Sequence, residues 1–191
     1  MHKIRIGLIL LAFVCFDNQL VSAQRRKAEP FDVQHYKFDV RLDDKSDSIS
    51  VDAIINIIYD KEVPPITILD LADRTNTNYG MLIRTLIVNG EPVDFVHNQD
   101  QVKITTPKSI TTGDTAKIEI SYSGRPDNGL VIIKNFNGTR TYFAEHWPNR
   151  AHRWLPVIDH PSEKATCEFL VTAPAQYEVV SNGDRIDVKI I

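Results

Sequence analysis

Residues 49–59 read ISVDAIINIIY, and apolar side chains recur there at every second position. Ile55 and Ile57 share one phase of this pattern, whereas Asp52 and Asn56 lie on the other. A period of two is typical of a β-strand buried on one face, because successive side chains of a strand point to opposite faces. The stretch therefore predicts a half-buried strand.

The same alternation recurs along the chain, in residues 36–42, 116–122 and 165–171. Turn-forming residues separate these runs, and Asn89-Gly90 between two apolar triplets is a strong hairpin signal. No amphipathic stretch of helical period and useful length is found. We therefore predict an all-β fold, an antiparallel β-sandwich with about eight to twelve strands.

The composition fits an ordinary globular protein: 191 residues, 42% hydrophobic and 25% charged. Low-complexity and disordered classes are excluded, since such compositions do not build a packed core. The formal net charge is −3, from 22 basic and 25 acidic residues. This balance gives no attraction to polyanions and disfavours nucleic-acid binding.

The N-terminus has the three parts of a secretory signal. Lys3 and Arg5 precede an apolar run at residues 6–16, and small residues follow at Ser22 and Ala23. The run is too short to span a bilayer, which takes about 20 apolar residues. We expect residues 1–23 to be a signal peptide, 24–30 a polar leader and 31–191 one β domain, exported to the periplasm or the extracellular space.

The number of cysteines indicates a domain that is stabilised by its hydrophobic core rather than by disulfides. Cys15 lies within the predicted signal, so Cys167 would be the only cysteine of the exported protein. A single thiol cannot form an internal disulfide. Because Cys167 shares the apolar phase of residues 165–171, we predict a core residue rather than a nucleophile.

Residues 142–166, YFAEHWPNRAHRWLPVIDHPSEKAT, break the alternating pattern. This segment contains both tryptophans, three of the six histidines and three prolines. Long irregular segments on a β scaffold often form binding surfaces. The alternative is an ordered corner loop, with its aromatic side chains packed on the sheet and Arg–Asp pairs fixing it.

The segment also resembles a known family. WPNRAHRWLP at residues 147–156, followed by DHPSEKAT at 159–166, is similar to the N-terminal domain of the aminopeptidase N family of zinc metallopeptidases. Shorter landmarks agree, at residues 68–71 (ILDL) and 88–90 (VNG), and the resemblance spans residues 31–183.

The resemblance implies a saddle-shaped β domain that precedes a thermolysin-like catalytic domain and closes one side of its active site. Zinc and the general base come from a His-Glu-x-x-His motif in that catalytic domain, and metal-activated water attacks the N-terminal peptide bond. This sequence contains no such motif. We therefore expect the chain to end before the catalytic domain, to contain no cofactor and to be inactive when isolated. In the full-length enzyme, it would bind the N-terminus of a peptide substrate together with the zinc-bearing catalytic domain.

In the family, a Gln of the N-terminal domain anchors the free α-amino group of the substrate. Its position falls on Glu145 here, and a second, acidic position falls on Trp147. A carboxylate can also accept charge-assisted hydrogen bonds from an ammonium group, and Trp147 can shape the pocket or face the cation. The alternative is that Glu145 is a solvated carboxylate or a partner of Arg150 or Arg153.

Other residues of the motif suggest structural roles. Arg153 and Asp159 bracket Trp154-Leu155-Pro156, and a buried pair between them would lock the corner. The remaining structural positions of the motif are Trp154, Pro156, Pro161 and Lys164. His146, His152 and His160 have spacings of six and eight, which suit no regular metal site, so no metal ligands are predicted.

The last residues, RIDVKII at 185–191, have a strand-like pattern directly after an Asn-Gly turn. Family members continue beyond this hairpin, so we expect an incomplete sheet with an unpaired edge, which is an association hazard. Two interpretations result. The first is the substrate-anchoring domain of an exported zinc aminopeptidase; the second is a non-catalytic secreted β-sandwich interaction module, binding through its Trp-rich segment.

Overall fold

The computed structural model describes residues 29–74 and 78–189. The predicted signal peptide and residues 24–28 of the predicted leader lie outside the described residues. The described part contains eleven strands and a single turn of 3-10 helix, η1 (Ala151–Arg153). The all-β prediction is therefore confirmed. No helix of the described residues is long and apolar enough to cross a membrane.

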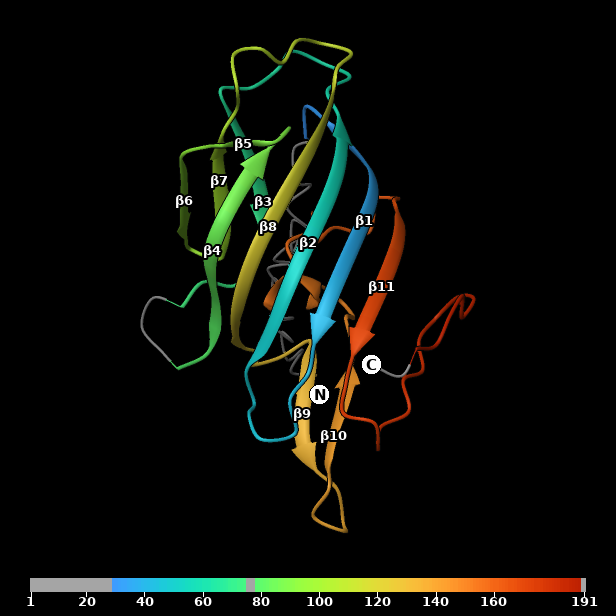
Figure 1. Ribbon diagram of the computed structural model, residues 1–191. Helices are drawn as coiled ribbons and strands as arrows, with labels where there is room; N and C mark the ends of the chain where they lie inside the picture. Colours follow the sequence, from blue (N-terminus) through green and yellow to red (C-terminus); the bar gives the residue numbers. More distant parts are fainter. Residues whose placement is uncertain (1–28, 75–77, 190–191) are drawn as a thin grey trace, which may run out of the picture.

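The largest sheet has six strands in the order β11-β1-β2-β8-β4-β5 (Figure 1). All neighbours are antiparallel except β1 and β11, which run parallel. In the same order, the strands are β11 (Thr166–Thr172), β1 (Asp32–Arg41), β2 (Ile49–Ile58), β8 (Thr115–Arg125), β4 (Gly80–Val88) and β5 (Glu91–Pro92).

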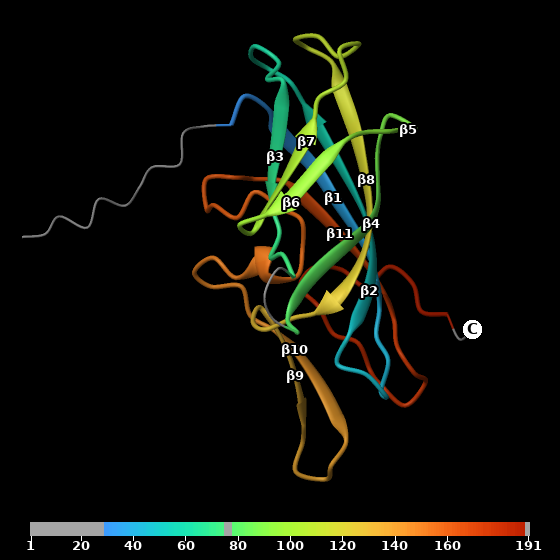
Figure 2. The same cartoon turned by 90° about the vertical axis from the view of Figure 1, so that its left-hand side faces the viewer.

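Two smaller sheets complete the fold. A three-stranded sheet pairs β7 (Gln101–Thr105) with β3 (Ile66–Asp70) on one side and β6 (Phe95–Asn98) on the other. The hairpin of β9 (Leu130–Lys134) and β10 (Arg140–Ala144) projects from the body at one end (Figure 2).

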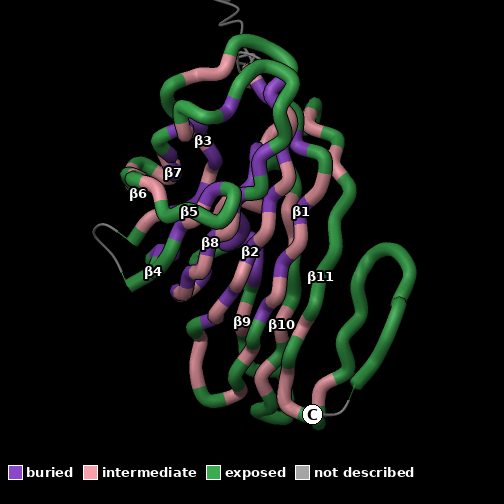
Figure 3. Tube along the Cα trace, turned by 45° about the horizontal axis from the view of Figure 1, so that its top comes forward, coloured by how far each residue is buried: buried purple, intermediate pink, exposed green. Residues whose placement is uncertain are grey.

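The alternating stretch quoted first forms β2, in the middle of the large sheet between β1 and β8. Its inward side chains are at most 2% exposed: Ile49, Val51, Ala53, Ile55 and Ile57. The aligned positions of β8 are Ala116, Ile118, Ile120 and Tyr122, equally buried. The period of two thus marks the core face, because the opposite face of these strands is more exposed (Figure 3).

One face of the large sheet is covered by two different structures (Figure 2). The three-stranded sheet covers one end, and the irregular chain after β10 covers the other. From that chain, Trp154, Leu155, Val157 and Ile158 enter the hydrophobic core. This layered arrangement confirms the predicted sandwich, and it shows that the irregular segment forms part of the second layer.

The Asn89-Gly90 turn is confirmed by its backbone. Both residues have positive φ, 51° and 88°, and they connect β4 to the short strand β5. Positive φ at both central residues matches a two-residue hairpin turn of the type favoured by Asn-Gly.

Two expectations near the C-terminus are wrong. Cys167 is exposed, because β11 is an edge strand whose residues are largely open to solvent (Figure 3). Alternation identifies two faces of a strand, but it does not tell whether a second layer covers one of them. Residues 185–189 form no strand, and residues 190 and 191 lie outside the described residues.

Candidate functional site

Glu145 lies where the β9–β10 hairpin passes into the irregular segment. Its N–H donates a hydrogen bond of 2.8 Å to the carbonyl of Gly129, which extends the hairpin ladder by one step. Gly129 has a φ of +73°, and a Cβ atom there would overlap the carbonyl oxygen of Arg150. The close approach of these backbones therefore requires glycine and fixes the position of Glu145.

The Glu145 carboxylate is held on both oxygens. Its Oε2 atom lies 2.5 Å from Nη1 of Arg150, and its Oε1 atom accepts a 3.2 Å hydrogen bond from the Trp147 N–H. The carboxylate side chain remains 40% exposed. Of the two partners considered from the sequence, Arg150 makes the contact and Arg153 does not.

An exposed apolar strip leads to Glu145 along the hairpin. Phe143 lies two positions before Glu145 and is therefore on the same side of the chain, and it is directly opposite Val131. Ile133 continues this side toward the tip of the hairpin. Phe143, Ile133 and Trp147 are 60%, 54% and 78% exposed. Glu145 thus stands at the end of an apolar surface open to a partner or ligand.

Behind this surface, His146 and Trp154 form a partly buried contact. The indole Nε1–H of Trp154 donates a 3.1 Å hydrogen bond to Nε2 of His146. Burial lowers the pKa of His146 below its ordinary value, against the opposing effect of the carboxylates of Asp159 and Glu145. The imidazole is therefore neutral at pH 7 and free to accept this bond.

The predicted pair of Arg153 and Asp159 is wrong. The turn η1 directs Arg153 toward two other loops, where its guanidinium pairs with Asp127 and Asp100. Asp159 instead accepts hydrogen bonds from the ring and the backbone N–H of His152, at 2.6 and 3.1 Å. Burial would raise the pKa of Asp159, but the contacts with His152 outweigh it and the pKa is lowered. Both residues fix the corner, through different partners.

Backbone bonds attach the segment to the core. Asp70 and Val157 exchange both backbone hydrogen bonds, at 2.8 and 3.0 Å, and the Asp70 carboxylate accepts the Asp159 N–H. Asp70 belongs to the ILDL landmark, so the landmark and the long motif are structurally linked. Pro156 is buried beside Val157, whereas Pro161 and Lys164 are exposed.

Two tyrosines that sequence reasoning missed also hold the segment. The hydroxyl of Tyr122 donates to the carbonyl of Trp154 at 2.8 Å, and the Ile158 N–H donates to the hydroxyl of Tyr36 at 3.1 Å. Both tyrosines occupy the inward phase of alternating strands. A tyrosine at an inward-facing position of a strand buries its hydroxyl, which then needs a hydrogen-bond partner. The alternating pattern of the sequence already indicated this for both tyrosines.

The described residues contain no group of three or more His, Cys, Asp or Glu side chains that could hold a metal ion. The three histidines of the segment are instead engaged separately, with Trp154, Asp159 and Ser162. Zinc therefore does not fit these residues, and no step of chemistry at a metal is assigned to them.

The fold and the motif agree with a family of known proteins. Residues 32–190 match the Peptidase M1 N-terminal domain, and the chain therefore belongs to this family. A search of curated proteins finds no match.

Solved structures of M1 zinc metallopeptidases have the same fold. The enzyme from Deinococcus radiodurans is 26% identical with a TM-score of 0.62, over 77% of this chain and 33% of that one. A two-domain mutant bound to L-arginine is 25% identical with a TM-score of 0.64, over 76% and 33% of the two chains. A mutant bound to L-tryptophan is 26% identical with a TM-score of 0.60, over 75% and 33%. This chain thus spans about one third of the structures it matches.

Proposed function

We propose that this chain acts as the N-terminal, substrate-anchoring domain of an exported zinc metallo-aminopeptidase, which removes N-terminal amino acids from peptides. By itself the chain is inactive, and the zinc and its ligands belong to a further domain. Family membership favours this function over a secreted interaction module without enzymatic ancestry.

The position of Glu145 carries the proposal. Its carboxylate is half-exposed and is held by Arg150 and the Trp147 N–H. Counting back from Asp159-His160-Pro161, the resemblance assigns the amine-anchoring position of the family to this residue. An ammonium group approaching from solvent would meet a carboxylate that is already oriented, so little ordering of the side chain would be needed. Two solved relatives contain L-arginine or L-tryptophan, and both molecules carry an α-ammonium group.

The surroundings of Glu145 suit an active site closed by a second domain. Trp147 would contact the first side chain of the peptide, and the apolar strip of Val131, Ile133 and Phe143 would pack against the catalytic domain. Closing the site in this way would exclude water and strengthen the contact between the ammonium and the carboxylate.

Export is the part of the proposal that depends on residues 1–23 alone. If these residues are a signal peptide, the protein secreted by its native host begins at Gln24. N-terminal sequencing of protein recovered from the periplasm or the medium tests this directly. Retention of the full chain in the cytoplasm would contradict export without affecting the anchoring role.

The anchoring role is tested in a fusion in which residues 32–190 replace the matched third of the Deinococcus radiodurans enzyme. The readout is hydrolysis of aminoacyl coumarin amides with a free α-amine. Loss of one charge-assisted hydrogen bond, about 1.5–3 kcal/mol, predicts that Glu145→Ala lowers kcat/KM by about 10- to 100-fold. Glu145→Gln should retain part of the activity, because the amide oxygen still accepts one hydrogen bond.

Glu168→Ala is the matched control, since Glu168 is another half-exposed carboxylate in an ion pair, with Lys37. It should leave kcat/KM unchanged. If Glu145→Ala and Glu168→Ala have equal effects in a folded fusion, Glu145 does not contact the substrate amine. If the folded wild-type fusion is inactive, the proposal that this chain serves as such a domain fails.

A further inference from the structure

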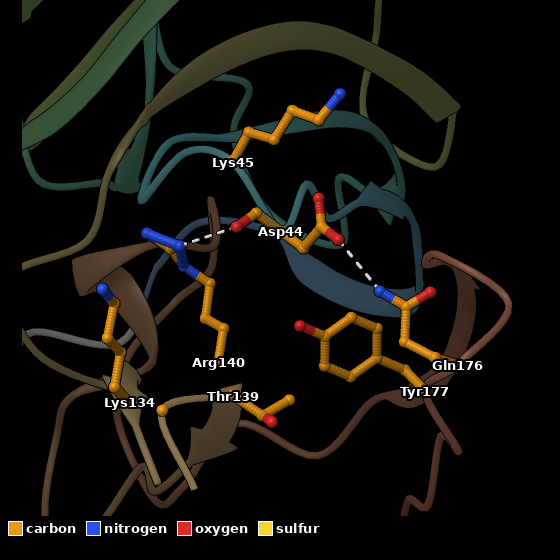
Figure 4. Close-up of a pocket in the computed structure, with 8 residues that line it drawn as sticks. Asp44, Lys45, Lys134, Thr139, Arg140, Gln176 and Tyr177 are labelled. Atoms are coloured by element: carbon orange, nitrogen blue, oxygen red, sulfur yellow. Dashed lines mark hydrogen bonds between the residues drawn. The ribbon is translucent and has the colours of Figure 1, made fainter.

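A cavity of about 440 Å³ lies beside the turn end of the β9–β10 hairpin (Figure 4). Three segments far apart in the sequence form its walls: the turn after β1, the hairpin itself, and the chain beyond β11. The residues that line it are Asp44, Lys45, Lys134, Gly138, Thr139, Arg140, Gln176 and Tyr177.

The walls of this cavity are held by direct contacts. The guanidinium of Arg140 donates to the carbonyl of Asp44 at 2.8 Å, and the side-chain amide of Gln176 donates to the Asp44 carboxylate at 2.9 Å (Figure 4). The ring of Tyr177 packs edge-on against Tyr142 of β10, with 5.6 Å between centroids. The cavity is thus formed before any ligand enters it.

Two cations face each other across the hairpin. Lys134 and Arg140 are direct cross-strand partners, and like charges at such positions destabilise a sheet. Arg140 pairs with Asp47, but this carboxylate is shared with Arg125, and the Nε–H of Arg140 is buried without an acceptor among the described residues. Lys134 has no carboxylate partner in the described part of the chain. Positive charge at this wall is therefore only partly compensated.

Neutral donors supplement these cations. The hydroxyls of Thr139 and Tyr177 line the cavity and have no hydrogen-bond partner among residues 29–74 and 78–189. The single lining carboxylate, Asp44, is engaged by Gln176, and Lys45 adds a further positive charge. Of the four charged lining residues, three are cationic, so the cavity favours a negatively charged group.

We propose that this cavity binds an oxyanion, a carboxylate or phosphate group, between Lys134 and Arg140. The oxyanion would accept hydrogen bonds from the Lys134 ammonium and from the hydroxyls of Thr139 and Tyr177, and its charge would relieve the repulsion across the hairpin. The site is separate from Glu145. One face of the hairpin carries Lys134 and Arg140. The other face carries Val131 and Phe143, and Glu145 lies on that face because it follows Phe143 by two positions.

The experiment is an NMR titration of the full ¹⁵N-labelled chain with sodium phosphate and, separately, sodium acetate, at constant ionic strength set with sodium chloride. We expect saturable shifts of the Gly138, Thr139 and Tyr177 amides. Saturation by phosphate alone identifies a phosphate site, saturation by acetate alone a carboxylate site, and saturation by both a general oxyanion site. Absence of saturable shifts with both anions overturns the proposal.

Variants assign the site to its residues. Lys134→Gln should weaken the apparent affinity at least about tenfold, and Thr139→Val should weaken it less, because it removes a neutral donor. Lys108→Gln removes the same charge from an exposed position outside the cavity and should bind as the wild type does. Equal affinities of Lys134→Gln and Lys108→Gln, each with the dispersed spectrum of a folded protein, would also overturn the proposal.

Discussion

The contact between Tyr122 and Trp154 allows a direct test of how the irregular segment is held. Tyr122 is completely buried in β8, and its hydroxyl donates a 2.8 Å hydrogen bond to the carbonyl of Trp154. Burial raises the pKa of Tyr122 well above its ordinary value, so the hydroxyl is protonated at neutral pH and can donate this bond. Tyr122→Phe removes this donor and keeps the aromatic ring.

The expected loss of stability in Tyr122→Phe depends on the Trp154 carbonyl, which loses its hydrogen-bond donor. The Trp154 carbonyl would be buried without its partner, which costs about 1–3 kcal/mol, and the missing hydroxyl leaves a small void. We expect the free energy of unfolding to fall by about 2 kcal/mol, a large part of the 5–15 kcal/mol typical of a domain. The Trp154 side chain should become more mobile as its backbone loses this attachment to the sheet.

Urea unfolding followed by far-UV circular dichroism measures the change in stability, and the anisotropy of native-state tryptophan fluorescence measures the mobility. Tyr177→Phe is the control, because the Tyr177 hydroxyl has no partner among the described residues, and it should change stability by less than about 0.5 kcal/mol. A Tyr122→Phe variant as stable as Tyr177→Phe would refute the view that the hydroxyl holds the segment.

Three further predictions concern other parts of the fold. Because folding lowers the pKa of His146, the unfolded chain binds the proton first; stability should therefore fall as the pH falls below about 6.5, and urea unfolding of His146→Gln should lack this component. Gly124→Ala should cost about 1–3 kcal/mol in urea unfolding, since its Cβ would overlap the backbone of Gly80; an unchanged midpoint would contradict this. Although Cys167 lies on an exposed edge strand, partial desolvation of its thiol, with a smaller effect of the Glu168 carboxylate, raises its pKa, so its alkylation by iodoacetamide should have a midpoint above pH 9; a midpoint at or below pH 9 would be evidence against this.

Much of the fold could be predicted because its signals are local. The period of two in β2 and β8 and the Asn89-Gly90 turn depend on residues adjacent in the sequence, and the structure confirms them. The long motif could be placed in one segment for the same reason. Its contribution to the core through Trp154 and Leu155 corresponds to the ordered corner loop that was one of the two sequence interpretations.

The errors concern partners that are distant in sequence. Arg153 and Asp159 are close along the chain, but Asp127 and Asp100 are brought to Arg153 by loops of other strands, and no local pattern reports this. Cys167 has the sequence pattern of a half-buried strand, yet its burial depends on whether another layer covers β11. In both cases the deciding quantity is the packing of elements rather than the pattern within one element.

The ion pair between Glu145 and Arg150 bears directly on the anchoring proposal. Both side chains are about 40% exposed, and exposed ion pairs contribute about 0–1 kcal/mol, so exchanging Arg150 for a substrate ammonium would cost little. Before a substrate binds, Arg150 and the Trp147 N–H keep the Glu145 carboxylate in one orientation. Under the anchoring proposal, Glu145 takes the place of a neutral Gln of the family, and Arg150 balances the added negative charge when no substrate is bound.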